Sequence, residues 1–224
     1  MDWESLVLAS GIFRERQPRY DRVYFEYMSS RDEAAWYSDA GPNDVQVTEL
    51  FRFLNQWASH YPSDADARAR FKRAYLQVLP RLRALQGLTL LDTAFDRDVV
   101  QEMCVSEAVS SIFETIAGLG SRYASTATSK ILHVLNPPLF VMWDSAIRGG
   151  YAVDSRSDDY ARRFLPRVQR QAKEAVDSYI RDGRADPATA VQDLERLCDG
   201  RPLAKLVDEY NYCKFTLRRD ELWG

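Results

Sequence analysis

Residues 129–144 have the sequence SKILHVLNPPLFVMWD, and this stretch decides how the middle of the chain folds. The segment TATSKILHVL, residues 126–135, has apolar side chains at helical spacing, and Pro137 and Pro138 must end that helix. The apolar run PLFVMW then predicts an extended, buried connector that leads to Asp144. The next residues, SAIRGGY, are typical of a helix start, so Asp144 is predicted to be its N-cap.

Helical spacing recurs on both sides of this stretch and predicts an all-α fold. The segments that show it are residues 43–61, 64–87, 96–118, 157–183, 187–197 and 202–223. Pro80 is expected to kink or break the second of these helices. The first 40 residues are the exception and predict an irregular segment, in which DRVYFEYM (residues 21–28) alternates as a strand does.

The domain organisation predicted from these patterns is one compact unit over residues 1–224. Residues 97–155 form its central, catalytic core, and residues 1–96 and 156–224 pack around that core. Neither a low-complexity tract nor a linker divides the chain. A chain of 224 residues is long enough to bury a sizeable core without disulfides or a structural metal.

The composition is that of a globular protein in a reducing compartment. Hydrophobic residues make up 46% of the chain and charged residues 28%. The three cysteines, Cys104, Cys198 and Cys213, are far apart, and with only two histidines they argue against a disulfide framework and a metal site. The N-terminal sequence MDWESLVLAS lacks the features of a signal peptide, and no apolar run approaches the length of a membrane span. We therefore expect a cytoplasmic monomer without metal, cofactor or membrane contact.

Positive charge is concentrated in two segments, although the whole chain carries a net charge of −3. Residues 120–173 hold nine basic and four acidic residues, and residues 65–86 hold six basic residues and one acidic residue, so each segment carries +5. Such a pattern indicates either solvated helix faces or a footprint for a polyanion such as DNA.

Asp144 can be a structural cap or a chemical group. A cap carboxylate accepts backbone N–H bonds at the positive end of a helix, and both effects favour its ionised form even among apolar neighbours. Lys130 and His133 are three residues apart and therefore share a helix face that differs from the apolar one. Asp144 is the residue of this stretch whose type and setting point most directly to chemistry.

The run IAGLGSRYAS…ILHVLNPPLFVMWDSAI resembles the core of the helix-hairpin-helix DNA glycosylases, in particular the 8-oxoguanine glycosylase-like branch. The resemblance covers roughly residues 112–155. Gly118, Leu119 and Gly120 match the family's hairpin, although Ala117 replaces its proline, and Asp144 matches the shared catalytic aspartate. The resemblance implies an all-α DNA glycosylase that hydrolyses the N-glycosidic bond of a flipped-out base.

The resemblance, together with the charge pattern and with the shared helix face of Asp208 and Tyr212, predicts a set of site residues. The DNA-contacting residues are expected to be Gly118, Gly120, Arg122, Ser125, Ser129 and Arg148, and the base pocket is expected to contain His133, Trp143, Tyr151, Asp208 and Tyr212. Bifunctional members have a lyase lysine shortly after the hairpin. That position falls on Arg122 when counted from Gly120 and near Ser125 when counted from Asp144, so hydrolysis is the default and Lys130 is the candidate lysine.

Three alternatives for the function remain open at this point. The first is the DNA glycosylase. Its target base is an oxidised purine by family default, or a hypermodified base of phage DNA, which would make the protein a defence factor. A non-catalytic helical DNA-binding or interaction module is the second hypothesis, and Asp144 opposes it because an acid weakens contact with phosphate. The third, an RNA-cleaving enzyme or toxin, would use His133 as a base.

Overall fold

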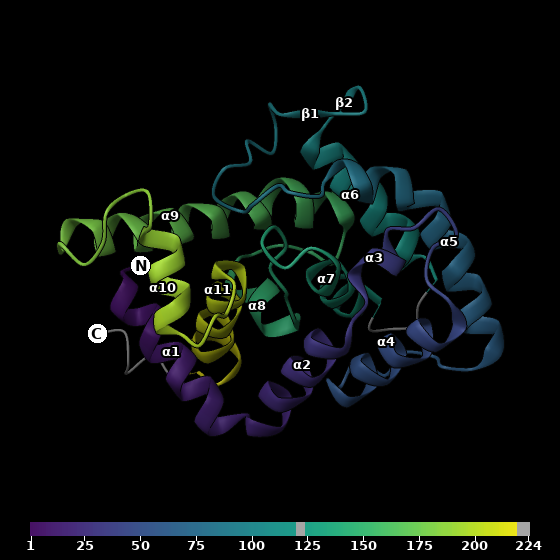
Figure 1. Cartoon of the computed structure of the whole chain (residues 1–224), viewed down its shortest axis with the longest axis horizontal. Coiled ribbons are helices and arrows are strands. Elements are labelled where there is room, and N and C mark those ends of the chain that lie inside the picture. The colour runs from purple at the N-terminus through teal and green to yellow at the C-terminus, as the bar shows by residue number, and fades with distance from the viewer. Residues whose placement is uncertain (120–123, 219–224) are drawn as a thin grey trace.

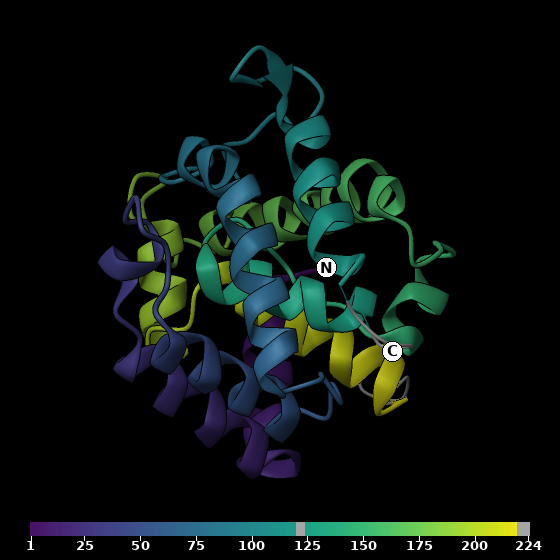
Figure 2. The ribbon, with the colours of Figure 1, turned by 90° about the vertical axis from the view of Figure 1, so that its right-hand side faces the viewer.

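The helices of the protein surround a central segment that contains α7 and α8 (Figures 1 and 2). The computed structural model describes residues 1–119 and 124–218. Its α-helices are α1 (Trp3–Arg16), α2 (Pro18–Ser30), α3 (Glu33–Trp36), α4 (Asp44–Gln56), α5 (Ala65–Ala84), α6 (Val105–Ala117), α7 (Ala124–Leu135), α8 (Ser145–Gly150), α9 (Leu165–Arg181), α10 (Ala190–Leu197) and α11 (Leu203–Asn211). Two π-helical segments, η1 (Asp159–Phe164) and η2 (Tyr212–Thr216), and the strands β1 (Val99–Val100) and β2 (Met103–Cys104) complete the described part. The predicted all-α class is confirmed.

The connector between α7 and α8 has the predicted form. α7 ends at Leu135, two residues before the first of the two prolines, and Asn136 donates its side-chain amide to the carbonyl oxygen of Leu85 at 2.8 Å. The side chains from Leu139 to Trp143 are at most 2% exposed. Because this apolar run is locked into the core, it fixes where α8 begins.

The N-terminal region is helical, so the prediction of an irregular segment with a strand at residues 21–28 was wrong. Pro18 stands in the first turn of α2, where its missing N–H costs nothing. The buried side chains of α2 are Val23, Tyr24 and Tyr27, which share one helix face. Packing of that face outweighs the local alternation of side chains in the sequence.

A small hairpin replaces the first turns of the helix expected from residue 96 onward. Strand β1 pairs with β2, and the chain turns between them at Gln101 and Glu102, whose φ angles are 48° and 66°. Two successive left-handed residues are what a two-residue hairpin turn requires. Helix α6 then begins at Val105, and the hairpin projects from the body of the molecule (Figures 1 and 2).

Helix α5 continues through Pro80, which was expected to break or kink it. A proline inside a helix costs about 3 kcal/mol because it removes one hydrogen bond and clashes with the preceding turn. The side chains of Val78, Leu79 and Leu82 are at most 3% exposed. Burial of this face on both sides of the proline offsets the local penalty.

The packing of the helices brings the two ends of the chain together. α1 lies against α11, α6 lies against both α5 and α7, and α2 lies against α4. Buried hydrophobic side chains from Leu6 to Cys213 form a single cluster. The N-terminal and C-terminal helices can therefore supply walls to a site near α7.

Candidate active site

A cavity of about 710 Å³ lies beside α7 and the start of α8. This volume is within the range of small-molecule sites. Its lining comes from both ends of the chain as well as from the centre: Phe13, Tyr20, Trp57, Ala58, Ala117, Ala124, Ser125, Thr126, Lys130, Met142, Trp143, Asp144, Ser145, Ile147, Arg148, Ser155, Asp208, Tyr212 and Thr216.

Asp144 is held in the cavity wall by two hydrogen bonds. Its Oδ1 accepts the backbone N–H of Ile147 at 2.8 Å, which makes it the N-cap of α8 as predicted. Its Oδ2 accepts the hydroxyl of Thr216 at 2.7 Å. One oxygen is thus fixed by the local helix and the other by a residue 72 positions away, so the carboxylate has a defined orientation toward the cavity.

Trp143 and Arg148 form the wall next to Asp144. The indole N–H of Trp143 donates to the carbonyl oxygen of Ser125 at 3.2 Å, which ties the connector to the start of α7. The guanidinium carbon of Arg148 lies 5.5 Å from the centre of the Trp143 ring, and Arg148 also donates to the Thr126 hydroxyl at 3.3 Å. Burial lowers the pKa of Arg148, and the charge of Asp144 opposes this shift.

Lys130 reaches the same cavity from α7. Its amino group donates to the carbonyl oxygen of Trp57 at 2.5 Å and to the hydroxyl of Ser59 at 3.0 Å, and both acceptors are uncharged. Burial lowers the pKa of Lys130 to about 8, while the charges of Asp208 and Asp144 act in the opposite direction. A share of this amine is therefore neutral near physiological pH, the form in which an amine can attack an electrophile.

An aromatic wall faces these groups from the N-terminal half of the chain. The Trp57 indole donates to the carbonyl oxygen of Tyr20 at 2.8 Å, and the two rings lie 6.0 Å apart. The Phe13 ring lies edge-on to that of Tyr212 at 5.4 Å. Phe13, Tyr20 and Trp57 are site residues that the sequence did not predict, because no local motif links residues of α1, α2 and the end of α4 to Asp144.

The structure brings seven of the predicted site residues to the cavity: Ser125, Lys130, Trp143, Asp144, Arg148, Asp208 and Tyr212. Gly118 is the C-terminal cap of α6 and does not line it. Gly120 and Arg122 lie outside the described residues, so the predicted hairpin is only partly described.

Three other predicted residues lie in the core instead. Ser129 is fully buried and shares hydrogen bonds with the backbone of Trp143, so it cannot contact a phosphate. Tyr151 donates its hydroxyl to Asn211 at 3.0 Å and packs against Phe164, behind the wall. In each case the surrounding helices cover a side chain whose exposure cannot be judged from sequence spacing.

His133 is the third of these residues, and it does not share a solvent-facing surface with Lys130. It is fully buried, with Nε2 at 3.0 Å from the Tyr24 hydroxyl and Nδ1 at 2.6 Å from the carbonyl oxygen of Phe140. Burial lowers the pKa of His133 to about 3. This imidazole is a neutral structural group that joins α7 to α2 and to the connector.

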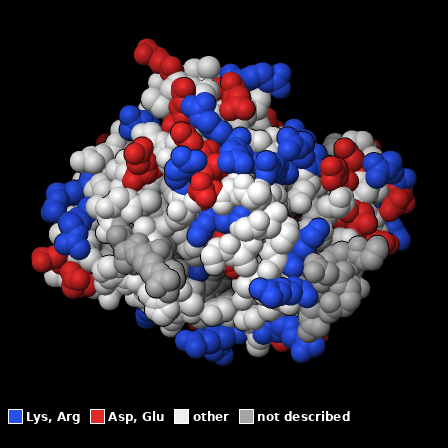
Figure 3. Space-filling model, turned by 180° about the vertical axis from the view of Figure 1, so that it is seen from behind, with Lys and Arg blue, Asp and Glu red and all other residues white. Residues whose placement is uncertain are grey.

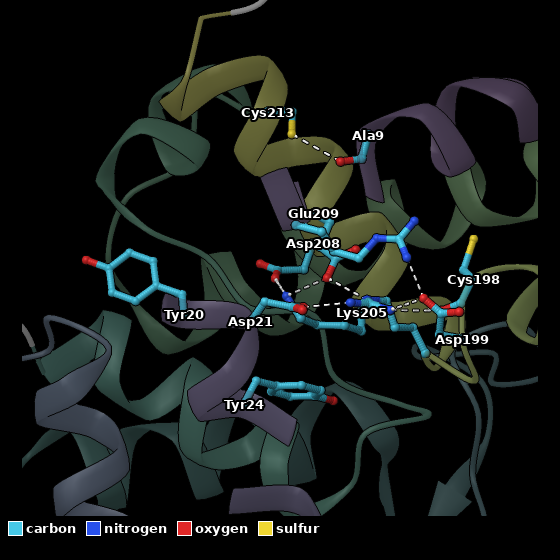
Figure 4. A network of polar contacts seen from close by, with 12 residues as sticks. Ala9, Tyr20, Asp21, Tyr24, Cys198, Asp199, Lys205, Asp208, Glu209 and Cys213 are labelled. Atoms are coloured by element: carbon cyan, nitrogen blue, oxygen red, sulfur yellow. Dashed lines mark hydrogen bonds and ion pairs between the residues drawn. The ribbon is translucent and has the colours of Figure 1, made fainter. Parts of the chain in front are cut away.

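A network of charges, three of them on α11, adjoins the aromatic wall (Figure 4). The Lys205 amino group lies 2.8 Å from Asp208 and 3.3 Å from Glu209, and Arg201 lies 3.2 Å from Glu209 and 2.6 Å from Asp21. We refer to these five residues as the α11 charge cluster. Burial lowers the pKa of Lys205, but the two carboxylates outweigh it and raise the pKa overall.

Local acids neutralise part of the basic segment 120–173. Arg163 pairs with Asp159 at 2.7 Å, and Arg162 pairs with Glu107 at 3.4 Å. Arg170 on α9 remains exposed to solvent. Figure 3 shows a face that is hollowed near its centre, with Lys and Arg side chains around the hollow.

Comparison with known proteins adds no family assignment: no protein-family model, curated protein or solved structure matches the chain. Among residues 1–119 and 124–218, no group of three or more His, Cys, Asp or Glu side chains is placed to hold a metal ion. The helices in the same ranges are too short or too polar to cross a membrane. The chemistry of the cavity therefore has to be inferred from its own side chains, a fixed carboxylate and a half-buried amine between aromatic walls.

Proposed function

We propose that this protein is a DNA glycosylase that releases a modified or damaged base from DNA. The observation that carries the proposal is that the Asp144 carboxylate and the Lys130 amine face one aromatic-walled cavity. Departure of a base leaves positive charge on the deoxyribose, and a fixed carboxylate stabilises that charge. The aromatic side chains can hold a base that has been flipped out of the duplex.

The surroundings of Lys130 support a larger role for this residue than its sequence position indicated. With a pKa of about 8, its neutral amine can attack C1′ of the sugar as the bond to the base breaks and the base leaves with the bonding electrons and takes up a proton. The C1′–O4′ bond then breaks, O4′ takes up the proton released by the amine, and an imine forms between Lys130 and C1′ of the opened sugar. We therefore propose lyase activity in addition to base release, in place of the hydrolytic default.

The target base is an oxidised purine or a bulkier, hypermodified base such as phage DNA carries. A cavity of about 710 Å³ has room for a base with a large substituent. The second target would give the protein a role in defence rather than in repair. In either case we propose that it acts as a cytoplasmic monomer on DNA, and a panel of duplexes with single modified bases distinguishes the targets.

The test is base release by Asp144→Asn under single-turnover conditions. Asparagine caps a helix nearly as well as aspartate, so the substitution removes the charge and leaves the fold intact. We expect release to fall by about a hundredfold or more, the usual scale for loss of one electrostatic partner of a transition state, with DNA binding retained.

Asp64→Asn is the matched control. Asp64 caps α5 through the same contact, a backbone N–H at 2.8 Å, but it lies outside the cavity. If both variants release base at the wild-type rate, Asp144 is only a cap and the glycosylase proposal loses its central residue. DNA binding without base release in the wild-type protein, across the panel of bases, would favour the non-catalytic DNA-binding module.

Borohydride trapping tests the lysine separately. A covalent protein–DNA adduct is expected in the wild-type protein and not in Lys130→Met. Base release without any adduct would return the mechanism to hydrolysis by water. The RNA-cleaving alternative receives no support from His133, because both of its ring nitrogens are engaged in the core.

A further inference from the structure

The α11 charge cluster carries an inference that rests on the proposed function. We propose that Asp208, held in place by Lys205, is a positioning residue that sets the protonation state of the Lys130 amine. Asp208 would thereby decide the pH range in which Lys130 can act as a nucleophile, without touching the sugar itself.

Asp208 connects the cluster to the cavity. It lines the cavity, whereas Lys205, Glu209, Arg201 and Asp21 do not. Its side chain is only 8% exposed, and its Oδ2 is fixed by the Lys205 amino group at 2.8 Å. A carboxylate that is held from behind in this way has a constant position relative to the cavity.

The amino groups of Lys130 and Lys205 both lie near the ring of Trp57. The Lys130 amino group lies 5.4 Å from the centre of the indole, and that of Lys205 lies 5.1 Å from the same centre. Phe13 and Tyr24 complete an apolar enclosure around Lys205, at 4.4 Å and 5.3 Å. Two ammonium groups on one ring, in a setting of low polarity, make each amine sensitive to a nearby carboxylate.

The groups that face Lys130 come from five surrounding segments, which are the one after α4, the start of α8, α11, α2 and η2. The segment after α4 supplies only the neutral oxygens of Trp57 and Ser59. The start of α8 contributes Asp144 and Arg148 to the cavity, α11 contributes Asp208 with Lys205 behind it, and the phenols of Tyr20 and Tyr212 lie in the remaining wall. The pKa of Tyr212 is raised by burial to about 12, so this phenol is neutral at physiological pH.

Asp208 and Asp144 line the cavity together with Lys130, and both carboxylates favour its protonated form. Burial lowers the pKa of Lys130, and of the two carboxylates that counter it, Asp208 contributes more than Asp144, while Lys205 adds a smaller shift in the direction of burial. Without Asp208, Lys130 should lose its proton at still lower pH. The positioning carboxylate therefore keeps the amine from being neutral over the whole physiological range.

The experiment measures the protonation of Lys130 directly, in the full-length protein without DNA. The rate of acetylation of Lys130 by acetic anhydride is followed by mass spectrometry as a function of pH. In the wild-type protein the midpoint should lie near pH 8. In Asp208→Asn we expect it to move to lower pH by about one pH unit, and in Asp208→Glu, which keeps the charge, it should return toward the wild-type value.

Asp199→Asn is the control, since Asp199 also pairs with Arg201, at 3.3 Å, but lies on the far side of the cluster and outside the cavity. It should leave the midpoint unchanged. The inference is overturned if Asp208→Asn leaves the midpoint where it was, or if Asp199→Asn moves it equally.

A double variant covers the case in which Asp208→Asn does not fold because Lys205 loses a partner. Lys205→Met with Asp208→Asn removes both charges of the pair, which leaves no new unpaired charge. Its midpoint should still move down, but by less than that of the single variant, because loss of Lys205 acts in the opposite direction. An upward move, or none, would contradict the proposal.

The result is separable from the fate of the proposed function. If borohydride traps no adduct in the wild-type protein, the lyase proposal fails, but the acetylation midpoint still reports whether Asp208 controls Lys130. If an adduct does form, the pH dependence of trapping in Asp208→Asn should shift in parallel with acetylation. Trapping that keeps its wild-type pH profile while acetylation shifts would show that Lys130 is not the trapped amine.

Discussion

Lys130 and Lys205 lie on the same tryptophan ring, yet their pKa values shift in opposite directions. Burial lowers the pKa of Lys130 to about 8, and the charges of Asp208 and Asp144 oppose this shift only in part, since the amine donates its hydrogen bonds to neutral oxygens. Lys205 is fully buried, but the adjacent carboxylates of Asp208 and Glu209 raise its pKa. Trp57 contributes to the surroundings of both amines and therefore does not explain the difference.

The comparison teaches that burial alone does not determine what a lysine can do. An ammonium that is paired directly with carboxylates is a fixed structural charge, whereas a buried one that donates its hydrogen bonds to neutral oxygens gives up its proton more easily. The cavity around Lys130 is therefore suited to chemistry, and the α11 charge cluster around Lys205 is suited to holding α11 in place.

The largest expected effect is on folding stability. Lys205→Met leaves Asp208 without its partner and Glu209 with Arg201 alone, so the free energy of unfolding should fall by about 3–5 kcal/mol. Lys130→Met removes an ammonium whose burial is unfavourable, and should cost about 1 kcal/mol or less. Urea unfolding of both variants at neutral pH measures the difference. Equal losses would remove the distinction between the two lysines.

The next effect concerns His133, which stands one helical turn from Lys130 but faces the core. Its pKa is about 3 in the folded protein and near 6.5 when unfolded, so the unfolded chain binds the additional proton as the pH falls. Between pH 6.5 and 4.5 this should lower the free energy of unfolding by about 2 kcal/mol. In His133→Gln, which does not titrate, the fall should be smaller by that amount.

For Lys130 we expect a smaller effect on the free energy of unfolding, at alkaline rather than acidic pH. Because its folded pKa is lowered below the unfolded value, the unfavourable burial of its charge is fully present below pH 8 and is relieved as the pH rises. Between pH 7.5 and 9 this should add about 1 kcal/mol to the free energy of unfolding of the wild-type protein relative to Lys130→Met. No difference in slope between the two proteins would mean that the amine titrates normally.

The smallest expected effect is on DNA affinity, and it compares an arginine of the cavity wall with one that is held in an ion pair. Arg148 lies in the cavity wall and forms no ion pair with a carboxylate of residues 1–119 or 124–218, whereas Arg163 is paired with Asp159 at 2.7 Å. Arg148→Gln should weaken DNA binding and reduce the salt dependence by about one phosphate contact, while Arg163→Gln should change neither. Titrations of a labelled duplex at several salt concentrations measure the affinity and its salt dependence. Equal losses in the two variants would show that the ion pair with Asp159 does not keep Arg163 from contacting DNA.

Local sequence was sufficient for the segment that carries Asp144. A proline pair ends α7 wherever it is placed in a fold, and an aspartate before a helix start is a cap for reasons confined to four residues. Asp144 does accept the N–H of Ile147, and the connector before it is buried. By contrast, the hairpin at β1 and β2 and the helix α2 were predicted wrongly, since short apolar runs fit either period.

The helical class, the end of α7, the buried connector and the cap at Asp144 follow from the sequence, because they depend on backbone geometry and on neighbours within one or two turns. Only the tertiary structure decided which side chains meet in the cavity: packing of α1 and α2 beside α11 brings Phe13 and Tyr20 to residues more than a hundred positions away. It also decided the chemistry of the amines. The pKa of a lysine depends on burial and on charges that are near in space, and Lys130 acquires both from chain segments that the sequence places far from it.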